Sequence, residues 1–297
     1  MKILLTGRSG QVGYELERSL QGLGDVVALD RSGMDLAYPD RVREAIRSVK
    51  PGLIVNPAAY TAVDLAESEP DLAMRINAEA PAVMAEEARK LGAALIHYST
   101  DYVFDGSKIG GYVEGDTPNP QNVYGRSKLA GEQAIQASGV PHLILRTSWV
   151  YGMRGKNFLR TVQRLAQERD ELRIVADQFG APTWCRTIAE TTAHIVTKLQ
   201  AETRAGAKRL ISDEVWQDHA GVYHLTAHGR TSWHGFTQAI VDHASTVKKP
   251  RVTPIATVEY PLPAKRPHNS VLSSDKLRAA FCDLPDWDAA LRLCLEA

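Results

Sequence analysis

The sequence predicts an α/β fold in which a doubly wound parallel sheet is joined to a smaller C-terminal lobe. Short aliphatic runs alternate with amphipathic stretches in the first half of the chain, which is the order of strands and helices in such a sheet. Each run is nearly continuous, as in strands that helices cover on both faces. The expected strands are residues 2–6, 25–29, 53–56, 94–99 and 142–147.

The stretches between these strands carry the apolar spacing of helices. They comprise residues 12–22, 41–50, 71–91 and 124–138. After Gly152 the alternation stops, so we expect residues 1–152 to form a core and 153–297 to form mainly a substrate lobe, with some segments returning to the core. The second part predicts helices at 157–168, 186–200 and 233–246, strands at 172–175 and 221–225, and a proline-rich, mostly extended loop at 250–267.

The composition is that of a folded globular protein, with 44% hydrophobic and 24% charged residues among 297. The 35 basic and 35 acidic residues give no net charge, which argues against nucleic acid as a partner. No apolar run is long enough to cross a membrane, and the apolar residues after Lys2 are too few for a signal peptide. We therefore expect a cytoplasmic protein without a membrane or nucleic-acid partner.

The first expected strand runs into Gly7, Gly10 and Gly13, and an expected helix follows directly. The first glycine allows a tight turn, the second lets the backbone approach a pyrophosphate, and the third lets the helix pack closely. The N-terminus of that helix presents its amide groups to the anion. We therefore predict a Rossmann-type dinucleotide site, with Gln11 and Val12 inside the loop.

The second expected strand leads to Asp30, where an acidic side chain commonly binds the hydroxyls of the adenosine ribose. Asp30 alone favours NADH, whereas Arg31 beside it and Arg8 in the glycine loop suit the 2′-phosphate of NADPH. The competing interpretation is that both arginines are solvated surface residues, so the sequence leaves the choice between NADPH and NADH open. Asp35 and Leu36 follow closely and are expected to flank the adenine.

Tyr124 and Lys128 lie four residues apart at the start of an expected helix, so they share one helix face. A nearby ammonium lowers the pKa of a phenol, which would let Tyr124 exchange a proton with an alcohol or ketone oxygen. Upstream, Thr100 follows an expected strand, and its hydroxyl can donate to a carbonyl oxygen as negative charge develops there, with Ser99 as second choice. The competing interpretations are a solvated helix pair and a turn cap.

Together these motifs identify the sequence as similar to the extended short-chain dehydrogenases/reductases, and further segments resemble the dTDP-4-dehydrorhamnose reductase family. Those segments are NPAAYTAVDLAE (56–67), STDYVF (99–104), YGRSKLAGE (124–132), RTSWVYG (146–152), DQFGAPT (177–183) and PAKRPHNS (263–270). The resemblance spans almost the whole chain. It implies reduction of the C4 ketone of dTDP-4-dehydro-L-rhamnose by NADPH or NADH, with Tyr124 as proton donor.

The resemblance also implies roles for individual residues. Tyr124, Lys128 and Thr100 match the catalytic residues. The expected cofactor contacts are Gly7, Gly10, Gln11, Val12, Gly13, Asp30, Arg31, Asp35, Leu36, Ala58, Ala59, Tyr60, Tyr124 and Lys128. The expected substrate contacts are Thr100, Asp101, Tyr102, Trp149 and Arg266, although core packing of Trp149 and a surface turn at Arg266 are alternatives. The phenol of Tyr60 departs from the family pattern, which is tolerable if only its backbone faces the cofactor.

Some members of the family are described as dimers that Mg²⁺ bridges through glutamates. Glu15 stands at one such position, but Arg186 stands where a second carboxylate is expected, and a cation cannot bind Mg²⁺. We therefore expect no metal site, and a homodimer without a metal bridge stays open.

Two other functions compete with this one. The first is reduction or epimerisation of another 4-keto nucleotide sugar; an epimerase needs a further acid–base residue, which the sequence does not identify. The second is a non-catalytic regulatory subunit, against which the intact Thr100, Tyr124 and Lys128 argue.

Overall fold

The computed structural model of this chain describes residues 1–204, 213–244 and 248–296. Its central sheet has six parallel strands in the order β10-β5-β4-β3-β1-β2, which confirms the predicted α/β class. The first five strands end within one residue of their predicted bounds. The strands are β1 Lys2–Leu5, β2 Asp25–Ala28, β3 Leu53–Asn56, β4 Ala94–Thr100, β5 His142–Thr147 and β10 Gly221–His224.

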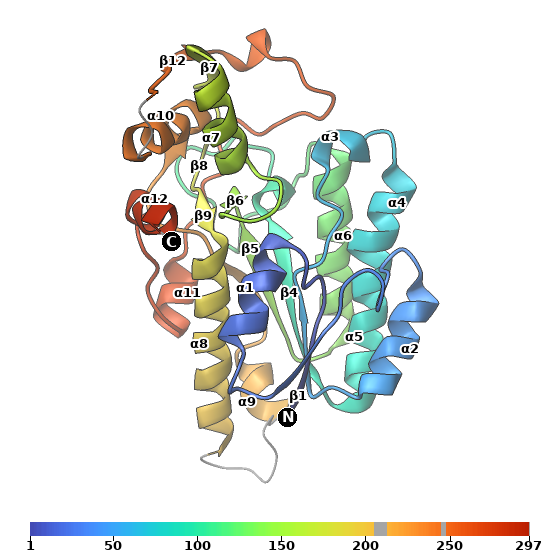
Figure 1. The fold of residues 1–297 in the computed structure, drawn as a ribbon. Coiled ribbons are helices and arrows are strands. Elements are labelled where there is room, and N and C mark those ends of the chain that lie inside the picture. The colour runs from blue at the N-terminus through green and yellow to red at the C-terminus, as the bar shows by residue number, and fades with distance from the viewer. Residues whose placement is uncertain (205–212, 245–247, 297) are drawn as a thin grey trace.

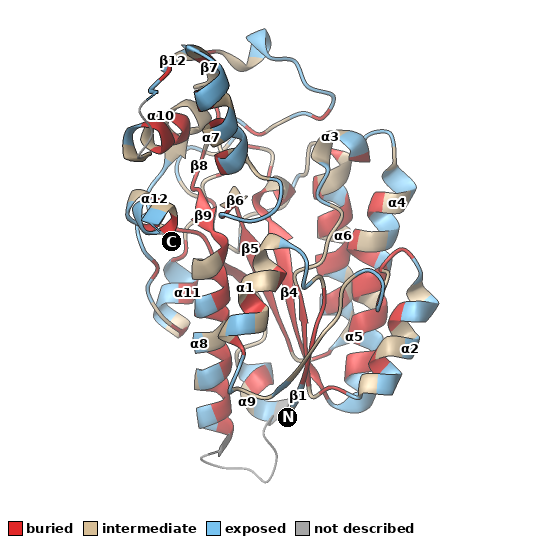
Figure 2. Cartoon of the chain, viewed as in Figure 1, coloured by how far each residue is buried: buried red, intermediate tan, exposed pale blue. Residues whose placement is uncertain are grey.

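Helices cover both faces of this sheet (Figure 1). Strand β1 shows why: Ile3 and Leu5 pack into the core beneath one helix layer, whereas Leu4 packs into the core of the other. Strands β3, β4 and β5 are buried along their whole length (Figure 2), as expected from their continuous apolar runs. One layer contains α1 Gln11–Ser19, α8 Cys185–Arg204 and α9 Asp213–Asp218, and the other contains α2 Pro39–Val49, α5 Ala80–Leu91 and α6 Val123–Ser138.

The predicted helix 71–91 is helical throughout, but its hydrogen-bond pattern changes along its length. It consists of α4 Pro70–Met74, a π-helical turn at Arg75–Glu79, and α5. Pro81 has no N–H to donate to the carbonyl of Asn77 four residues earlier, so the regular ladder cannot continue there. The freed carbonyl faces Gly131 of α6, where a Cβ would lie only 2.2 Å from the Asn77 oxygen. The prediction of a helix over 71–91 is therefore confirmed, and it contains a π-helical turn that the apolar spacing did not indicate.

The upper lobe in Figure 1 contains α7 Phe158–Glu168, α10 Trp233–His243 and α12 Trp287–Glu296 around a core of its own. Strand β12 Arg251–Ile255 pairs in parallel with β7 Glu171–Val175, so the prediction of a mostly extended loop over 250–267 is wrong at its start. Pro254 is tolerated because β12 pairs with β7 alone and is an edge strand. Positions 245 and 246 of the predicted helix 233–246 lie outside the described residues.

Segments from the second half of the chain return to the core. β10 extends the central sheet beside β5, and α8 lies against α1. The remaining elements are α3 Val63–Ala66, 3-10 turns at Asp101–Val103 and Thr257–Glu259, β6 Val150–Tyr151, β8 Phe179–Gly180, β9 Thr183–Trp184, β11 Thr231–Ser232 and α11 Asp275–Ala280. Within the described ranges, no helix has the length and apolarity to span a bilayer.

Candidate active site

The strand order places a ligand site at the carboxyl ends of β1 and β3. From β1 the chain first adds β2 on one side and then β3 on the other, so the sheet reverses its direction of growth between them. Ligands of doubly wound sheets bind in the crevice beyond such a reversal. The glycine loop follows β1, the Ala58–Tyr60 turn follows β3, and Thr100 ends β4. The topology therefore brings the predicted cofactor and catalytic residues to one edge.

The glycine loop has the geometry that a pyrophosphate needs. Gly7 adopts φ +59°, and a Cβ there would lie 2.9 Å from the Ala58 Cβ. A Cβ on Gly13 would lie 2.1 Å from the Gly7 carbonyl oxygen, so the third glycine is required by the loop as well as by helix packing. Gly10 caps α1 without a side-chain hydrogen bond, which leaves the amide groups of the first turn for an anion. These residues fit a dinucleotide cofactor.

Gln11 and Val12 connect this loop to the second lobe. The Gln11 side-chain oxygen accepts a hydrogen bond of 2.8 Å from Asn157, the residue that caps α7. Val12 packs against both the sheet core and the core of the upper lobe. The loop that is predicted to hold the cofactor is thus a junction between the two parts of the chain.

The residues expected at the adenosine end already have partners. Asp30 accepts hydrogen bonds from the Ser32 amide and hydroxyl at 2.9 and 2.6 Å, which lowers the pKa of its carboxyl. Arg31 pairs with Asp35 at 3.0 Å, and Arg8 pairs with Glu17 at 2.7 Å. Both ion pairs are at least partly exposed and are therefore weak, so a ligand phosphate can displace them.

Leu36 differs from these neighbours because its side chain lies in the sheet core. Only its backbone is available to a cofactor.

The turn after β3 is fixed by a residue that sequence reasoning missed. The Tyr60 amide donates to Asn77 Oδ1 at 2.8 Å, and Asn77 Nδ2 donates to the Tyr60 carbonyl and to Ser127 Oγ, both at 3.0 Å. Asn77 therefore links the turn to α6 between Tyr124 and Lys128. The phenol of Tyr60 donates to Glu69 at 2.7 Å, so its hydroxyl is engaged away from this backbone contact. The sequence signal that could have drawn attention to Asn77 is Pro81, which follows four residues later and leaves the Asn77 carbonyl without its helical N–H donor.

Tyr124 lies in the first turn of α6, which Asn122 caps through a bond from the Gly125 amide at 2.8 Å. Its ring stands edge-on to Tyr102 at 5.8 Å. Burial raises the pKa of Tyr124 to about 12, and a hydrogen bond with Thr100 opposes this. The direction is opposite to that expected from a neighbouring ammonium. Tyr124 therefore keeps its proton over the neutral range, as a proton donor must.

Lys128, one turn later, is 2% exposed. Nζ donates to the Tyr98 carbonyl oxygen at 2.6 Å and lies 3.1 Å from His97 Nε2. Burial lowers the pKa of Lys128 to about 8, and the Glu132 carboxylate opposes this. Across the described part of the chain, no carboxylate lies within ion-pair distance of this ammonium.

Thr100 and Asp101 form a buried pair beside Tyr124. The Thr100 hydroxyl donates to Asp101 Oδ1 at 3.0 Å and accepts from the Tyr102 amide at 3.2 Å. Burial raises the pKa of Asp101 to about 6, with hydrogen bonds from Ser270 and Thr100 opposing. To donate to a substrate ketone, Thr100 would have to turn its proton away from Asp101.

The other predicted substrate contacts are partly occupied by protein. Trp149 adopts φ +48°, a rare conformation for a residue other than glycine, and its ring stacks on Trp233 at 3.5 Å. Arg266 pairs with Asp64 at 2.8 Å and lies 5.9 Å from the centre of the Tyr102 ring. In the structure, Trp149 packs against Trp233 and Arg266 is ion-paired with Asp64. Contacts of either residue with a substrate stay predictions.

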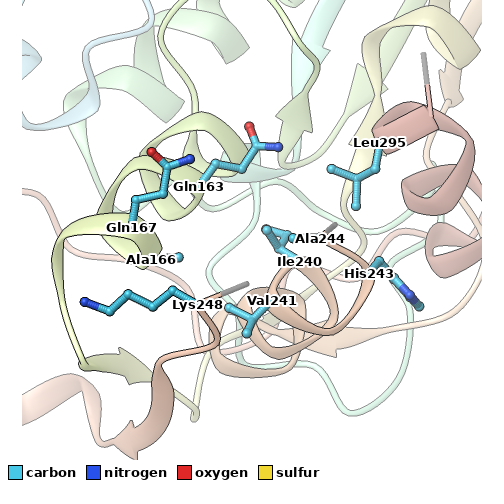
Figure 3. A pocket seen from close by; sticks show the side chains of 9 residues that line it. All are labelled: Gln163, Ala166, Gln167, Ile240, Val241, His243, Ala244, Lys248 and Leu295. Atoms are coloured by element: carbon cyan, nitrogen blue, oxygen red, sulfur yellow. The ribbon is translucent and has the colours of Figure 1, made fainter. Parts of the chain in front are cut away.

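Figure 3 shows a separate pocket, which is formed by α7, α10 and α12 and lined by residues such as Gln163, Ile240 and Leu295. None of the predicted cofactor, catalytic or substrate residues lines it. The candidate active site is therefore defined by the sheet edge and not by this pocket.

Comparisons with known proteins agree with this arrangement. A family description, the RmlD substrate binding domain, matches residues 1–297. The chain is 50% identical to a dTDP-4-dehydrorhamnose reductase of Burkholderia thailandensis, over 99% of this chain and 98% of the relative. It is 43% identical to the Escherichia coli K12 enzyme of the same name, over 99% and 97%.

Solved structures give the same result. A dTDP-4-dehydrorhamnose reductase from Clostridium acetobutylicum superposes with a TM-score of 0.88 at 36% identity, covering 100% of this chain and 99% of the other. The Bacillus anthracis enzyme in complex with NADP superposes with a TM-score of 0.88 at 34% identity, covering 99% and 98%. By full-length sequence similarity and by fold, this chain belongs to the dTDP-4-dehydrorhamnose reductase family.

Proposed function

We propose that this chain reduces the C4 ketone of dTDP-4-dehydro-L-rhamnose to dTDP-L-rhamnose with NADPH or NADH, as a step of dTDP-rhamnose biosynthesis. The observation that carries the proposal is the placement of Tyr124 and the buried Lys128 one turn apart on α6, at the sheet edge where the glycine loop lies. Residues 1–152 would hold the cofactor, and 153–297 would contribute mainly to the substrate side.

In this mechanism the protein aligns the ketone and supplies a proton. Bound reduced nicotinamide supplies the hydride that C4 receives. Tyr124 donates its phenolic proton to the oxygen that was the ketone. Thr100, with its proton turned from Asp101, donates a hydrogen bond to the same oxygen as charge develops. Lys128 binds the nicotinamide ribose and stabilises the phenolate that Tyr124 leaves behind.

The remaining assigned residues would bind the ends of the two ligands. The first-turn amides of α1 would hold the cofactor pyrophosphate, and Asp30 and Arg31 would compete to define the ribose end. Asp101, Tyr102 and Trp149 would contact the sugar nucleotide. Arg266 would reach the diphosphate by exchanging Asp64 for phosphate oxygens.

Loss of the reduced-nicotinamide absorbance on adding dTDP-4-dehydro-L-rhamnose tests the reaction directly. We expect turnover with this substrate, and running the assay with NADPH and with NADH decides the cofactor preference. Turnover only with another keto sugar, such as a GDP-linked one, would reassign the substrate. Cofactor binding without oxidation by any keto sugar would favour a regulatory subunit instead.

The assembly state belongs to the same proposal. Arg186 Nε lies 3.4 Å from Glu15 Oε2, so the position expected for a second metal-binding carboxylate carries the ion-pair partner of the first. This contact supports a chain that does not use Mg²⁺ to form a homodimer.

A further inference from the structure

A buried chain of hydrogen-bonding side chains runs from the start of the glycine loop to Lys128. Thr6 Oγ1 lies 2.6 Å from Asn56 Oδ1, and Asn56 Nδ2 lies 3.0 Å from His97 Nδ1. His97 Nε2 in turn lies 3.1 Å from Lys128 Nζ. All four residues are at most 2% exposed, and they come from β1, β3, β4 and α6 and their ends. The mechanism above uses Lys128 but gives no task to the other three.

Each hydrogen bond in this row of side chains needs one donor and one acceptor, which determines where the protons lie. Burial and the neighbouring Lys128 hold the pKa of His97 well below its usual range, so the imidazole is neutral and has one N–H and one lone pair. A charged Lys128 has only N–H groups to offer. Nε2 must then present its lone pair to Lys128, and the imidazole proton must sit on Nδ1.

This assignment requires the Asn56 amide to be turned over relative to the placement described above. Its amide oxygen has to face His97 Nδ1–H, and its amide nitrogen has to face Thr6 Oγ1. The two orientations of an amide exchange oxygen for nitrogen and leave the other atoms in place, so the distances are retained. Thr6 Oγ1 then accepts from Asn56 beside the Ala58 amide, which lies 3.4 Å away. If the Asn56 nitrogen instead faced His97 Nδ1, the imidazole proton would sit on Nε2. That N–H would need a lone pair on Lys128 Nζ, which only a neutral lysine has.

We propose that His97 is a positioning residue for Lys128: as the Nδ1–H tautomer, fixed by Asn56, it accepts a hydrogen bond from the ammonium at Nε2. The Tyr98 carbonyl accepts a second ammonium proton, which leaves the third without a protein partner among the described residues. The inference rests on the proposed role of Lys128. It explains how a buried ammonium is held in place by neutral acceptors, which leave its charge for the ligand and Tyr124.

The charged and titratable groups around Lys128 are few. On α6, Tyr124 precedes it by one turn and Glu132 follows it by one turn. Glu132 is engaged by Arg146 of β5 at 2.6 Å. On β4, His97 makes the direct contact, and β3 contributes the uncharged Asn56. Among the described residues, His97 is the side chain that contacts Lys128 Nζ, beside the Tyr98 backbone carbonyl, so a change at His97 acts on Lys128 directly.

Nitrogen-15 NMR of the unmodified, histidine-labelled enzyme tests the tautomer without any activity. The signal of His97 is assigned by its loss in His97→Gln. We expect a protonated, pyrrole-type Nδ1 and an unprotonated, pyridine-type Nε2 at neutral pH. A protonated Nε2 would overturn the proposal whether or not the chain is a reductase, whereas an enzyme that fails to oxidise NADPH would overturn only the proposed reaction.

Two variants separate positioning from packing. The amide of His97→Gln reaches the place of Nε2, whereas that of His97→Asn reaches only the place of Nδ1. We expect the pH at which kcat falls on the alkaline side to drop by about one unit in His97→Asn, because the ammonium loses an acceptor, and to stay near wild type in His97→Gln. The KM for the sugar nucleotide should stay within about threefold.

The matched control is His142→Asn, a buried histidine on the neighbouring strand whose Nδ1 contacts the Val140 carbonyl. It should retain the wild-type pH profile. An unchanged alkaline limb in folded His97→Asn, or equal shifts in the Asn and Gln variants, would show that His97 only fills space and would overturn the proposal.

Discussion

Two buried cationic side chains, Arg146 and Lys128, lie near each other in the core of this protein, and their hydrogen-bond partners differ in charge. Arg146 of β5 is 3% exposed and makes two bonds to Glu132, at 2.9 and 2.6 Å. Lys128 of α6 is 2% exposed and meets a carbonyl oxygen and an imidazole. Glu132 is only one turn from Lys128 on the same helix, yet its carboxylate is engaged by the arginine.

Under the proposed function, this difference separates a structural charge, Arg146, from a functional one, Lys128. A carboxylate that receives two hydrogen bonds cancels most of the field of Arg146, so that pair can serve only the fold. Neutral acceptors hold the Lys128 ammonium in place and leave its field for groups at the sheet edge. We therefore expect changes at the lysine side to act mainly on turnover, and changes at the arginine side to act mainly on stability.

The largest expected effect on turnover comes from Tyr124→Phe, which removes the proposed proton donor, one turn from Lys128 on α6. A positioned acid contributes roughly 10²–10⁴-fold, so kcat should fall by about that factor while NADPH binding stays near normal. Steady-state kinetics and cofactor fluorescence measure the two quantities. Tyr223→Phe, which removes a hydroxyl bonded to the His219 carbonyl far from Lys128 along the chain, is the control. An unchanged rate in Tyr124→Phe would refute the assignment.

The paired cation should respond in the opposite way. Glu132→Gln leaves Arg146 buried without its counter-ion, and breaking a buried pair in this way destabilises a protein by about 3–5 kcal/mol. Thermal unfolding followed by circular dichroism should show a Tm lower by about 5 °C or more. The turnover of the enzyme that remains folded should change by less than about tenfold. Replacing both partners by apolar residues, in Glu132→Leu with Arg146→Met, should recover most of the stability.

Lys128→Met should lower turnover without lowering stability. The variant loses charge-assisted hydrogen bonds worth about 1.5–3 kcal/mol each, so kcat should fall by roughly ten- to a hundredfold, and cofactor affinity should weaken as well. Because a buried ammonium without a carboxylate partner is removed, the Tm should stay equal or rise. A large fall in Tm with normal kcat would place Lys128 with Arg146 as a structural cation.

How much of the fold and of the site could be predicted depends on how far apart in the sequence the contacting residues are. The β1 strand and Gly7 form one local signal, since the strand, the turn and the helix follow each other directly, and both were predicted. Strand β12 was not predicted, because its partner β7 lies 80 residues earlier and Pro254 argues against a strand. The same holds for His97, which meets Asn56 and Lys128 at separations of 41 and 31 residues.

A partly exposed ion pair, Arg186 with Glu15, joins α8 to α1 and has the arginine side chain 41% exposed. Such a pair contributes at most about 1 kcal/mol, so here the effect on stability should be the smallest. Under the proposal that this chain forms no Mg²⁺-bridged dimer, its consequence concerns assembly, because the family resemblance aligns Arg186 with the second metal-binding carboxylate. Sedimentation equilibrium should give the same mass with Mg²⁺ and with EDTA, both for the wild type and for Arg186→Gln. A mass that falls in EDTA and is restored by Mg²⁺ would show that carboxylates other than this pair hold a bridging metal.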